Sequence, residues 1–191
     1  MAHQVSTHWA ALLCYAQNNK RLKATVTSTL DSPLTEPRSG DEQALLIEAI
    51  TTLFEHKISF NEFLGFKIAQ LDPQPVLITF EMRPELVGHF LYGRLHGGVI
   101  SSVLDVAGGL AVMLGIANFH AHESCDEIMQ RFAPLSTIDM RVDYLRQGIG
   151  QTFTAEASVV RLGRRVAVCS MRLSNEANSL IATGSATYMV S

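Results

Sequence analysis

The feature that most constrains this chain is an apolar segment that runs from Leu95 to Phe119. Asp105 is the only formally charged side chain between Arg94 and Glu123. The segment is long enough to cross a bilayer, but it holds this carboxylate and five glycines, and no basic flank follows it. It therefore predicts the buried helix of a soluble domain. Asp105 then needs a specific role, because an unpaired buried carboxylate is costly.

Composition limits the classes of function. The chain has 191 residues, 47% of them hydrophobic, which suffices for one domain with an appendage. Its formal net charge of -3 gives no electrostatic basis for binding nucleic acid. Cys14, Cys125 and Cys169 lie far apart without metal-like spacing, which is typical of a reducing compartment. The N-terminal residues lack the pattern of an export signal, so we expect a cytoplasmic protein.

A change in composition near residue 43 divides the chain. Residues 25–43 are rich in Thr, Ser, Pro and charged residues and follow neither the helical nor the strand period, which is typical of a linker. A helix is expected before this linker, over residues 7–23. We therefore assign residues 1–43 to an N-terminal helix and linker, and residues 44–191 to the folded domain.

The folded domain is expected to begin with an amphipathic helix over residues 44–57, where Leu46 and Ile50 recur at helical spacing. Residues 118–136 are irregular, and the central apolar helix starts near His96. Six runs have the composition of strands: 64–72, 76–82, 137–145, 152–162, 165–174 and 180–190. Short, turn-rich separators favour antiparallel neighbours. The predicted fold class is α+β, a curved antiparallel sheet of about six strands wrapped around the central helix.

Two stretches carry a family resemblance. They are MRPELVGHFLYGRLHGGVISSVLDVAGG, residues 82–109, and TIDMRVDYLR, residues 137–146. Both resemble the hotdog-fold acyl-CoA thioesterases of the 4-hydroxybenzoyl-CoA thioesterase superfamily, and the phenylacetate-pathway type is the nearest branch. The resemblance covers roughly residues 44–191, and LHGGVISSVLD is its most specific part. A hotdog is a curved sheet wrapped around a helix, which the periodicity predicts independently.

The resemblance implies an enzyme that hydrolyses an acyl-CoA thioester to a free acid and CoA. It implies no cofactor, because CoA is part of the substrate. It also implies a homo-oligomer, a dimer or a dimer of dimers, whose sites lie between subunits. An exposed sheet edge and C2 symmetry would allow such pairing. We expect no nucleic-acid partner and no membrane-spanning segment.

The resemblance also implies four catalytic residues. Asp105 matches the helix carboxylate that acts as nucleophile or general base, and Gly97 matches the glycine whose N–H binds the oxyanion. His89 stands where many relatives carry Asn, so its role is open. Thr137 matches a hydroxyl that contacts the carboxylate or its water. The structural alternatives are a paired or capping Asp, a glycine needed only for a turn, and an ordinary strand Thr.

Six further residues are candidates for substrate binding. His96 is expected to position the loop before the helix, and Gly98 offers a second backbone N–H there. In the family, the turn in RLGRRVAV lies near the pantetheine and phosphates of CoA, and guanidinium groups match phosphate oxygens. The candidates are His96, Gly98, Arg161, Gly163, Arg164 and Arg165. The arginines fit a solvated hairpin tip equally well.

Residues 118–127 gather His120, His122, Cys125 and Asp126, but their spacing matches no ligand motif, so no metal site is predicted. Two alternative functions remain at this point. One is a non-catalytic acyl-CoA-binding module, if His89 does not replace Asn. The other is a hotdog hydratase or dehydratase, whose signature segments are absent from the sequence.

Overall fold

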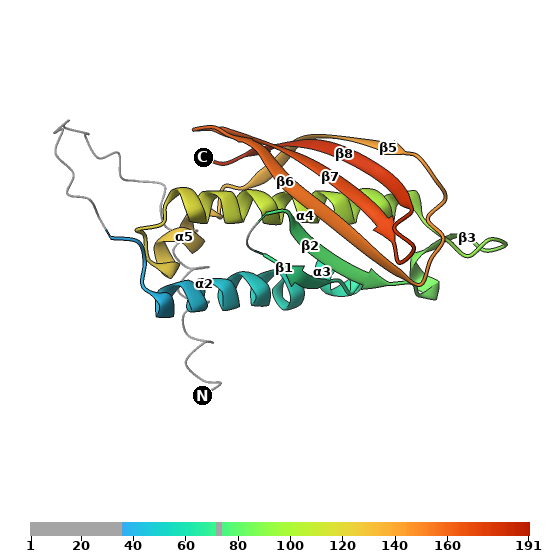
Figure 1. The fold of residues 1–191 in the computed structure, drawn as a ribbon, viewed down its shortest axis with the longest axis horizontal. Helices are drawn as coiled ribbons and strands as arrows, with labels where there is room; N and C mark the ends of the chain where they lie inside the picture. Colours follow the sequence, from blue (N-terminus) through green and yellow to red (C-terminus); the bar gives the residue numbers. More distant parts are fainter. Residues whose placement is uncertain (1–35, 72–73) are drawn as a thin grey trace. The chain divides into compact units, whose positions relative to one another are not determined.

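A computed structural model of the protein describes residues 36–71 and 74–191. The helix predicted over residues 7–23 lies outside this part of the chain. Pro37–Ser191 forms one compact unit (Figure 1). Within it, a six-stranded antiparallel sheet packs against one long helix. This arrangement confirms the predicted α+β class.

All six predicted strands are present. The sheet has the order β1-β2-β6-β7-β8-β5, and each neighbouring pair is antiparallel. The strands are β1 (Lys67–Gln70), β2 (Val76–Glu81), β5 (Ser136–Tyr144), β6 (Thr152–Leu162), β7 (Val166–Asn175) and β8 (Leu180–Met189). The last three strands follow one another through short turns and pair as their separators predict. The prediction that β5 and β6 are neighbours is wrong, because β5 pairs with β8 at the edge of the sheet. β1 and β5 are the edges of the sheet.

The apolar segment forms the central helix α4 (Gly97–Phe119). Figure 1 shows α4 lying along the inner face of the sheet. Its side chains form the centre of the core, and Leu104, Ala107, Leu110 and Leu114 are almost fully buried. α4 is long and apolar enough to cross a membrane, but 61% of its most apolar window is buried within the protein. A buried core helix accounts for its composition.

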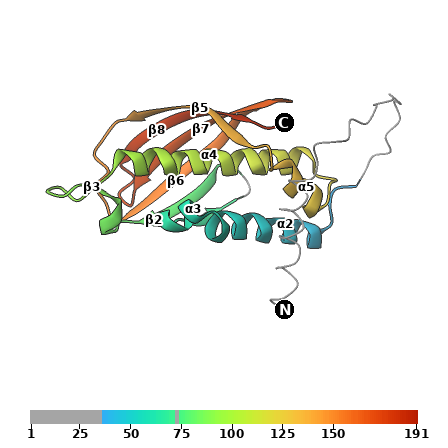
Figure 2. The same cartoon turned by 180° about the vertical axis from the view of Figure 1, so that it is seen from behind.

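The leading helix α2 (Gly40–Thr52) starts earlier than residue 44, inside the expected linker. The hydroxyl of Ser39 caps it by accepting the N–H of Glu42, a local bond that a linker-like composition conceals. Leu46 and Ile50 are buried, as their spacing predicts. α2 lies on the side of α4 that faces away from β7 and β8 (Figure 1, Figure 2).

Two further helical segments follow α2. A π-helical turn, η1 (Leu53–Lys57), leads into the short helix α3 (Ser59–Leu64). The prediction of a strand from residue 64 is wrong at its start, because Gly65 ends α3 with a positive φ of 70° and β1 begins only at Lys67.

Two elements in the middle of the chain also differ from expectation. Residues 118–136 are not wholly irregular, because α5 (Cys125–Arg131) forms there with a capping box between Ser124 and Glu127. Ahead of α4, the 3-10 turn η2 (Pro84–Leu86) leads into a small hairpin. Its strands are β3 (Val87–His89) and β4 (Arg94–Leu95).

Candidate active site

Asp105 lies in the middle of α4 and accepts hydrogen bonds from two hydroxyl groups of the sheet. The Thr137 hydroxyl donates to Asp105 Oδ1 at 2.9 Å. The Tyr188 hydroxyl lies 2.9 Å from the Asp105 backbone carbonyl oxygen and 3.2 Å from Oδ1. We call Asp105, Thr137 and Tyr188 the carboxylate cluster. It joins α4 to β5 and β8 and gives the carboxylate the hydrogen bonds that partial burial requires.

A β-bulge explains why Thr137 reaches α4. Met140 and Val142 on β5 pack against the core, so regular alternation would turn Ile138 inward and Thr137 outward. The β5–β8 register shifts between Thr137 and Asp139, which leaves Ile138 extra and 53% exposed. Thr137 therefore faces the core side, directly opposite Tyr188. Bulges commonly re-aim a side chain in this way.

Tyr188 is a proton donor in this cluster. Burial strongly raises the pKa of its hydroxyl, and the neighbouring Asp105 carboxylate raises that pKa further. The hydroxyl therefore stays protonated at physiological pH and can donate to the carboxylate.

The start of α4 forms a second group, His96, Gly97 and Gly98, which we call the glycine turn. His96 is the N-cap, and its Nδ1 accepts the Gly98 N–H at 2.9 Å. The N–H groups of Val99 and Ile100 both donate to the His96 carbonyl. The Gly97 N–H has no acceptor within the described part of the chain. Gly97 thus offers the one unsatisfied donor of the first helical turn.

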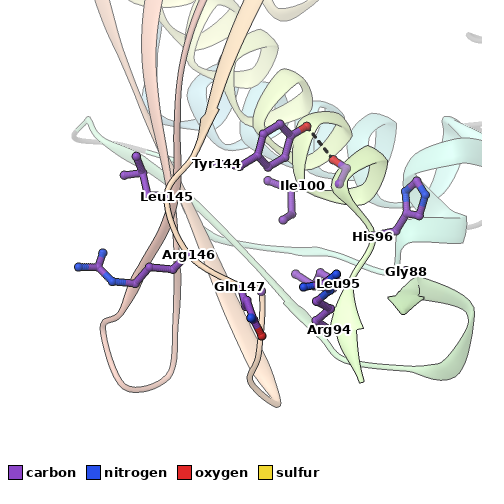
Figure 3. Close-up of a pocket in the computed structure, with 11 residues that line it drawn as sticks. Gly88, Arg94, Leu95, His96, Ile100, Tyr144, Leu145, Arg146 and Gln147 are labelled. Atoms are coloured by element: carbon purple, nitrogen blue, oxygen red, sulfur yellow. Dashed lines mark hydrogen bonds between the residues drawn. The ribbon is translucent and has the colours of Figure 1, made fainter. Parts of the chain in front are cut away.

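Tyr144 at the end of β5 holds the glycine turn from one side. Its hydroxyl donates to the Gly97 carbonyl at 3.0 Å (Figure 3). Gly88 on β3 approaches from the other side so closely that a Cβ there would collide with the backbone of His96. The absence of a side chain at Gly88 therefore permits the contact between the β3–β4 hairpin and the helix start.

The glycine turn borders a pocket of about 570 Å³. Its lining includes Gly88, Arg94, His96, Gly97, Ile100 and Tyr144. Figure 3 shows Tyr144 and Ile100 at the pocket, and Arg146, which also belongs to the lining, donates from its guanidinium to the Leu180 carbonyl oxygen. Asp105 is not part of the lining, since it lies eight residues further along α4. The rise of an α-helix separates Gly97 from Asp105 by about 12 Å along the axis.

His89 is outside the pocket lining, although its neighbour Gly88 belongs to it. Its ring lies against Tyr92, with the ring centroids 4.8 Å apart, and against Phe90. Its Nδ1 is buried and has no hydrogen-bond partner among the described residues. The role predicted for His89 therefore stays a prediction.

The predicted phosphate-binding residues lie elsewhere on the chain. The Gly163 N–H closes the β6–β7 turn by donating to the Val166 carbonyl. The arginines of this turn, Arg161, Arg164 and Arg165, are exposed. Leu162 at this turn lies near Gly115, at the far end of α4 from Gly97. The structure of one chain therefore does not bring Arg161, Arg164 and Arg165 to the pocket, and their binding role stays a prediction.

Sequence reasoning did not select Tyr188, Tyr144 or Gly108 for the site. The strand pattern places Tyr188 on the inward face, where its buried hydroxyl needs a hydrogen-bond partner. The sequence does not identify that partner. Tyr144 and Gly108 matter only through their contacts with other elements. In residues 118–127, Glu123 forms a salt bridge with Arg131 of α5, and His120 Nδ1 lies 3.1 Å from the Glu123 carboxylate. Within the described residues, no group of three metal-ligating side chains is present.

Comparison with known proteins places the chain in a family. The family model described as "Thioesterase superfamily" matches residues 92–182. The "Medium/long-chain acyl-CoA thioesterase YigI" of Escherichia coli K12 is 42% identical over 149 residues, which cover 78% of this chain and 95% of that protein. The chain belongs to the thioesterase superfamily. Human "Acyl-coenzyme A thioesterase 13" is 29% identical over 128 residues, 66% of this chain and 81% of that one.

A solved structure supports the same family. A Shewanella oneidensis protein described as related to the thioesterase superfamily superposes with a TM-score of 0.75 at 43% identity. The match covers 80% of this chain and 100% of that one. The predicted superfamily, fold and enzyme class, a thioesterase, are confirmed. The roles predicted for individual residues stay predictions.

Proposed function

We propose that the protein hydrolyses acyl-CoA thioesters, with Asp105 as the reacting carboxylate. The observation that carries this proposal is the carboxylate cluster: the only carboxylate of α4 is held by two hydroxyls at one oxygen, Oδ1. Oδ2 receives no hydrogen bond from the described residues. A carboxylate fixed at one oxygen and free at the other is suited to accept a proton from water or to attack a carbonyl carbon.

The chemistry follows from these groups. With Asp105 as general base, a water oxygen bonds to the thioester carbon while its proton passes to Oδ2. With Asp105 as nucleophile, Oδ2 bonds to that carbon and water later cleaves the anhydride. In both cases the carbonyl oxygen becomes negative, and the free N–H of Gly97 can stabilise it. The C–S bond then breaks and CoA leaves as a thiolate, which is protonated in solution.

The separation along α4 supports a site shared between two copies of the chain. About 12 Å of helix separates Gly97 from Asp105, which is too far for one carbonyl group to contact both. β5 is an edge strand with unpaired backbone groups on one side, and its Ile138 and Tyr144 are half exposed. Pairing of two β5 edges about a two-fold axis would close the sheet edge.

The surface of α4 permits such pairing. Gly98, Ser101, Ser102 and Asp105 form a partly exposed stripe of small residues beside β5. The hydroxyls of Ser101 and Ser102 are satisfied by the Gly98 carbonyl, so they leave no unpaired donor when covered. Two antiparallel copies of α4 that cross near Ser101, midway between Gly97 and Asp105, would bring the Gly97 of one copy towards the partner subunit's Asp105.

The substrate class is taken from a relative. The name of the Escherichia coli protein specifies medium- and long-chain acyl-CoA. Because the two chains are 42% identical over most of their length, we propose the same classes here. A soluble, cytoplasmic enzyme without a resident cofactor remains our expectation.

The direct test follows thiol release with a thiol-reactive dye, using acyl-CoAs of short, medium and long chains and an aromatic acyl-CoA. We expect release from medium- and long-chain substrates. Asp105→Ala and Asp105→Asn should lower kcat by about 10²- to 10⁴-fold, the range of a general base, while circular dichroism shows an unchanged fold. Full activity in both variants would refute the role of Asp105. Tight acyl-CoA binding without release would favour a binding module.

A mixing experiment tests the shared site. Asp105→Ala and Gly97→Pro chains are each expected to be inactive, since one lacks the carboxylate and the other lacks the N–H. Unfolded and refolded together in equal amounts, they should recover about a quarter of wild-type activity, because half of the dimers are mixed and each has one intact site of two. No recovery in a sample that is dimeric would place both groups within one chain.

A further inference from the structure

We propose that Tyr188 is a positioning residue that fixes the Asp105 carboxylate, and that Gly108 is a glycine so that the Tyr188 hydroxyl can reach it. This inference rests on the proposed function of Asp105. It adds a residue that neither the sequence motif nor the strand pattern selects.

The first argument is the burial of the tyrosine. Tyr188 is 2% exposed, and a buried hydroxyl is almost always hydrogen-bonded. Both of its acceptors belong to Asp105, the backbone carbonyl oxygen at 2.9 Å and Oδ1 at 3.2 Å. The helix fixes the position of that carbonyl. The tyrosine hydroxyl therefore connects the fixed main chain of Asp105 to its mobile side chain and restricts the rotation of the carboxylate.

The second argument is the strand register. Thr137 and Tyr188 lie directly opposite each other on β5 and β8, so their hydroxyls reach Asp105 from neighbouring strands. Both contact the same oxygen, Oδ1. The Thr137 hydroxyl donates to Oδ1, and the Tyr188 hydroxyl shares its one proton between Oδ1 and the nearer backbone carbonyl oxygen. Both contacts restrict Oδ1 and leave Oδ2 as the oxygen that can react.

The third argument is the shape of α4 beside the tyrosine. Gly108 lies three residues after Asp105, on the same face of the helix. A Cβ at Gly108 would overlap the Tyr188 hydroxyl and lie 3.0 Å from its Cζ. No side chain at this position is compatible with the hydrogen bonds of Tyr188, although Gly inside a helix is unfavourable in propensity.

The test is Tyr188→Phe, which keeps the buried ring and removes only the oxygen. We expect kcat to fall about tenfold, the value of a hydrogen bond to a charged group, with KM unchanged. Thr187→Val is the matched control, since it removes a hydroxyl from the adjacent residue on the other face of β8 and should keep wild-type kcat. An unchanged kcat in Tyr188→Phe, or an equal loss in Thr187→Val, would overturn the proposal.

A second measurement does not depend on activity. The free energy of unfolding is measured by urea titration for wild type, Tyr188→Phe, Asp105→Ala and the double variant. If Tyr188 holds the carboxylate, the two substitutions are non-additive, because each removes the same contact. Additive costs would mean that the Tyr188 hydroxyl binds only the main-chain carbonyl of Asp105 and does not hold its carboxylate. If wild type releases no thiol, the proposed function fails, and this cycle still decides whether Tyr188 holds Asp105.

Discussion

The carboxylate cluster and the glycine turn lie on the same helix but are stabilised in different ways. In the cluster, side chains from β5 and β8 determine where Asp105 points, and Tyr188 is almost fully buried. In the glycine turn, the reactive group is a backbone N–H whose position depends on the helix start. One group needs precise partners, whereas the other needs the absence of a partner.

The difference explains which residues accompany each group. His96 satisfies the N–H groups of Gly98, Val99 and Ile100 but not that of Gly97. The first turn of α4 is therefore stable while one donor remains available in an open pocket. The carboxylate has the opposite arrangement, since two donors converge on one of its oxygens. Substitutions can change one region and leave the other intact, so the two can be tested separately.

In the glycine turn, the largest effect is expected from removing its N–H donor. Gly97→Pro eliminates the N–H, and proline is tolerated at the first position of a helix. His96 already has the extended conformation that precedes proline, with φ -66° and ψ 139°. We expect kcat for acyl-CoA hydrolysis to fall about 10²- to 10³-fold, the usual cost of losing an oxyanion donor.

Gly97→Ala is the control for this substitution, because it keeps the N–H. A Cβ at Gly97 would lie 3.6 Å from the Tyr144 ring, which is an ordinary contact. The alanine variant should retain most of the wild-type kcat. If the alanine and proline variants lose the same activity, then the space at Gly97 matters and its N–H does not.

A smaller effect is expected in the carboxylate cluster, where one donor of two is removed. Thr137→Val keeps the shape of the side chain but loses the hydroxyl that donates to Asp105. We expect about a tenfold lower kcat, similar to Tyr188→Phe, since each removes one hydrogen bond to a charged group. Thr137→Ser retains the hydroxyl and should retain activity. A serine variant as slow as the valine variant would show that the methyl group, not the hydroxyl, is required.

The fit of α4 around the cluster should appear in stability. Gly108→Ala places a methyl group against the Tyr188 hydroxyl, and we expect a loss of about 1–3 kcal/mol in the free energy of unfolding, as for other overpacked cores. Gly115→Ala is the control on the same helix, because its Cβ would lie 3.4 Å from Val159. That variant should gain up to about 1 kcal/mol from helix propensity. If urea unfolding gives the same free energy of unfolding for Gly108→Ala and Gly115→Ala, the close contact between Gly108 and the Tyr188 hydroxyl does not require a glycine.

Much of the fold was predictable because it depends on periodic burial. The alternation in Phe153, Ala155 and Ala157 and the continuous apolar run of α4 each identify an element, and all three of these strand residues are buried. Asp105 was conspicuous as the only charge in that run. Thr137 does not stand out in the sequence, because regular alternation along β5 predicts that its side chain points away from the core. The family resemblance selected it, and the bulge at Ile138 brings it to the helix.

Other features depend on contacts between distant parts of the chain. Nothing in the sequence of β8 indicates that Tyr188 donates to Asp105, since the two are 83 residues apart. The capping box of α5 was readable as Ser124 and Glu127 at the right spacing, but a short helix among polar residues resembles a loop. A single sequence therefore predicts periodic elements better than pairwise contacts.

The smallest effect concerns the chemistry of a cysteine beside the cluster. The Cys169 Sγ lies 3.5 Å from the Gly108 carbonyl oxygen, and burial raises the pKa of the thiol to about 12. A thiol with a raised pKa stays protonated and unreactive at pH 8, because the thiolate is the nucleophile. Native protein treated with iodoacetamide at pH 8 should therefore remain unmodified at Cys169 by peptide mass spectrometry, whereas protein unfolded in urea should be alkylated. Rapid alkylation in the native state would mean that the core around Cys169, which is fully buried in the structure, opens to solvent.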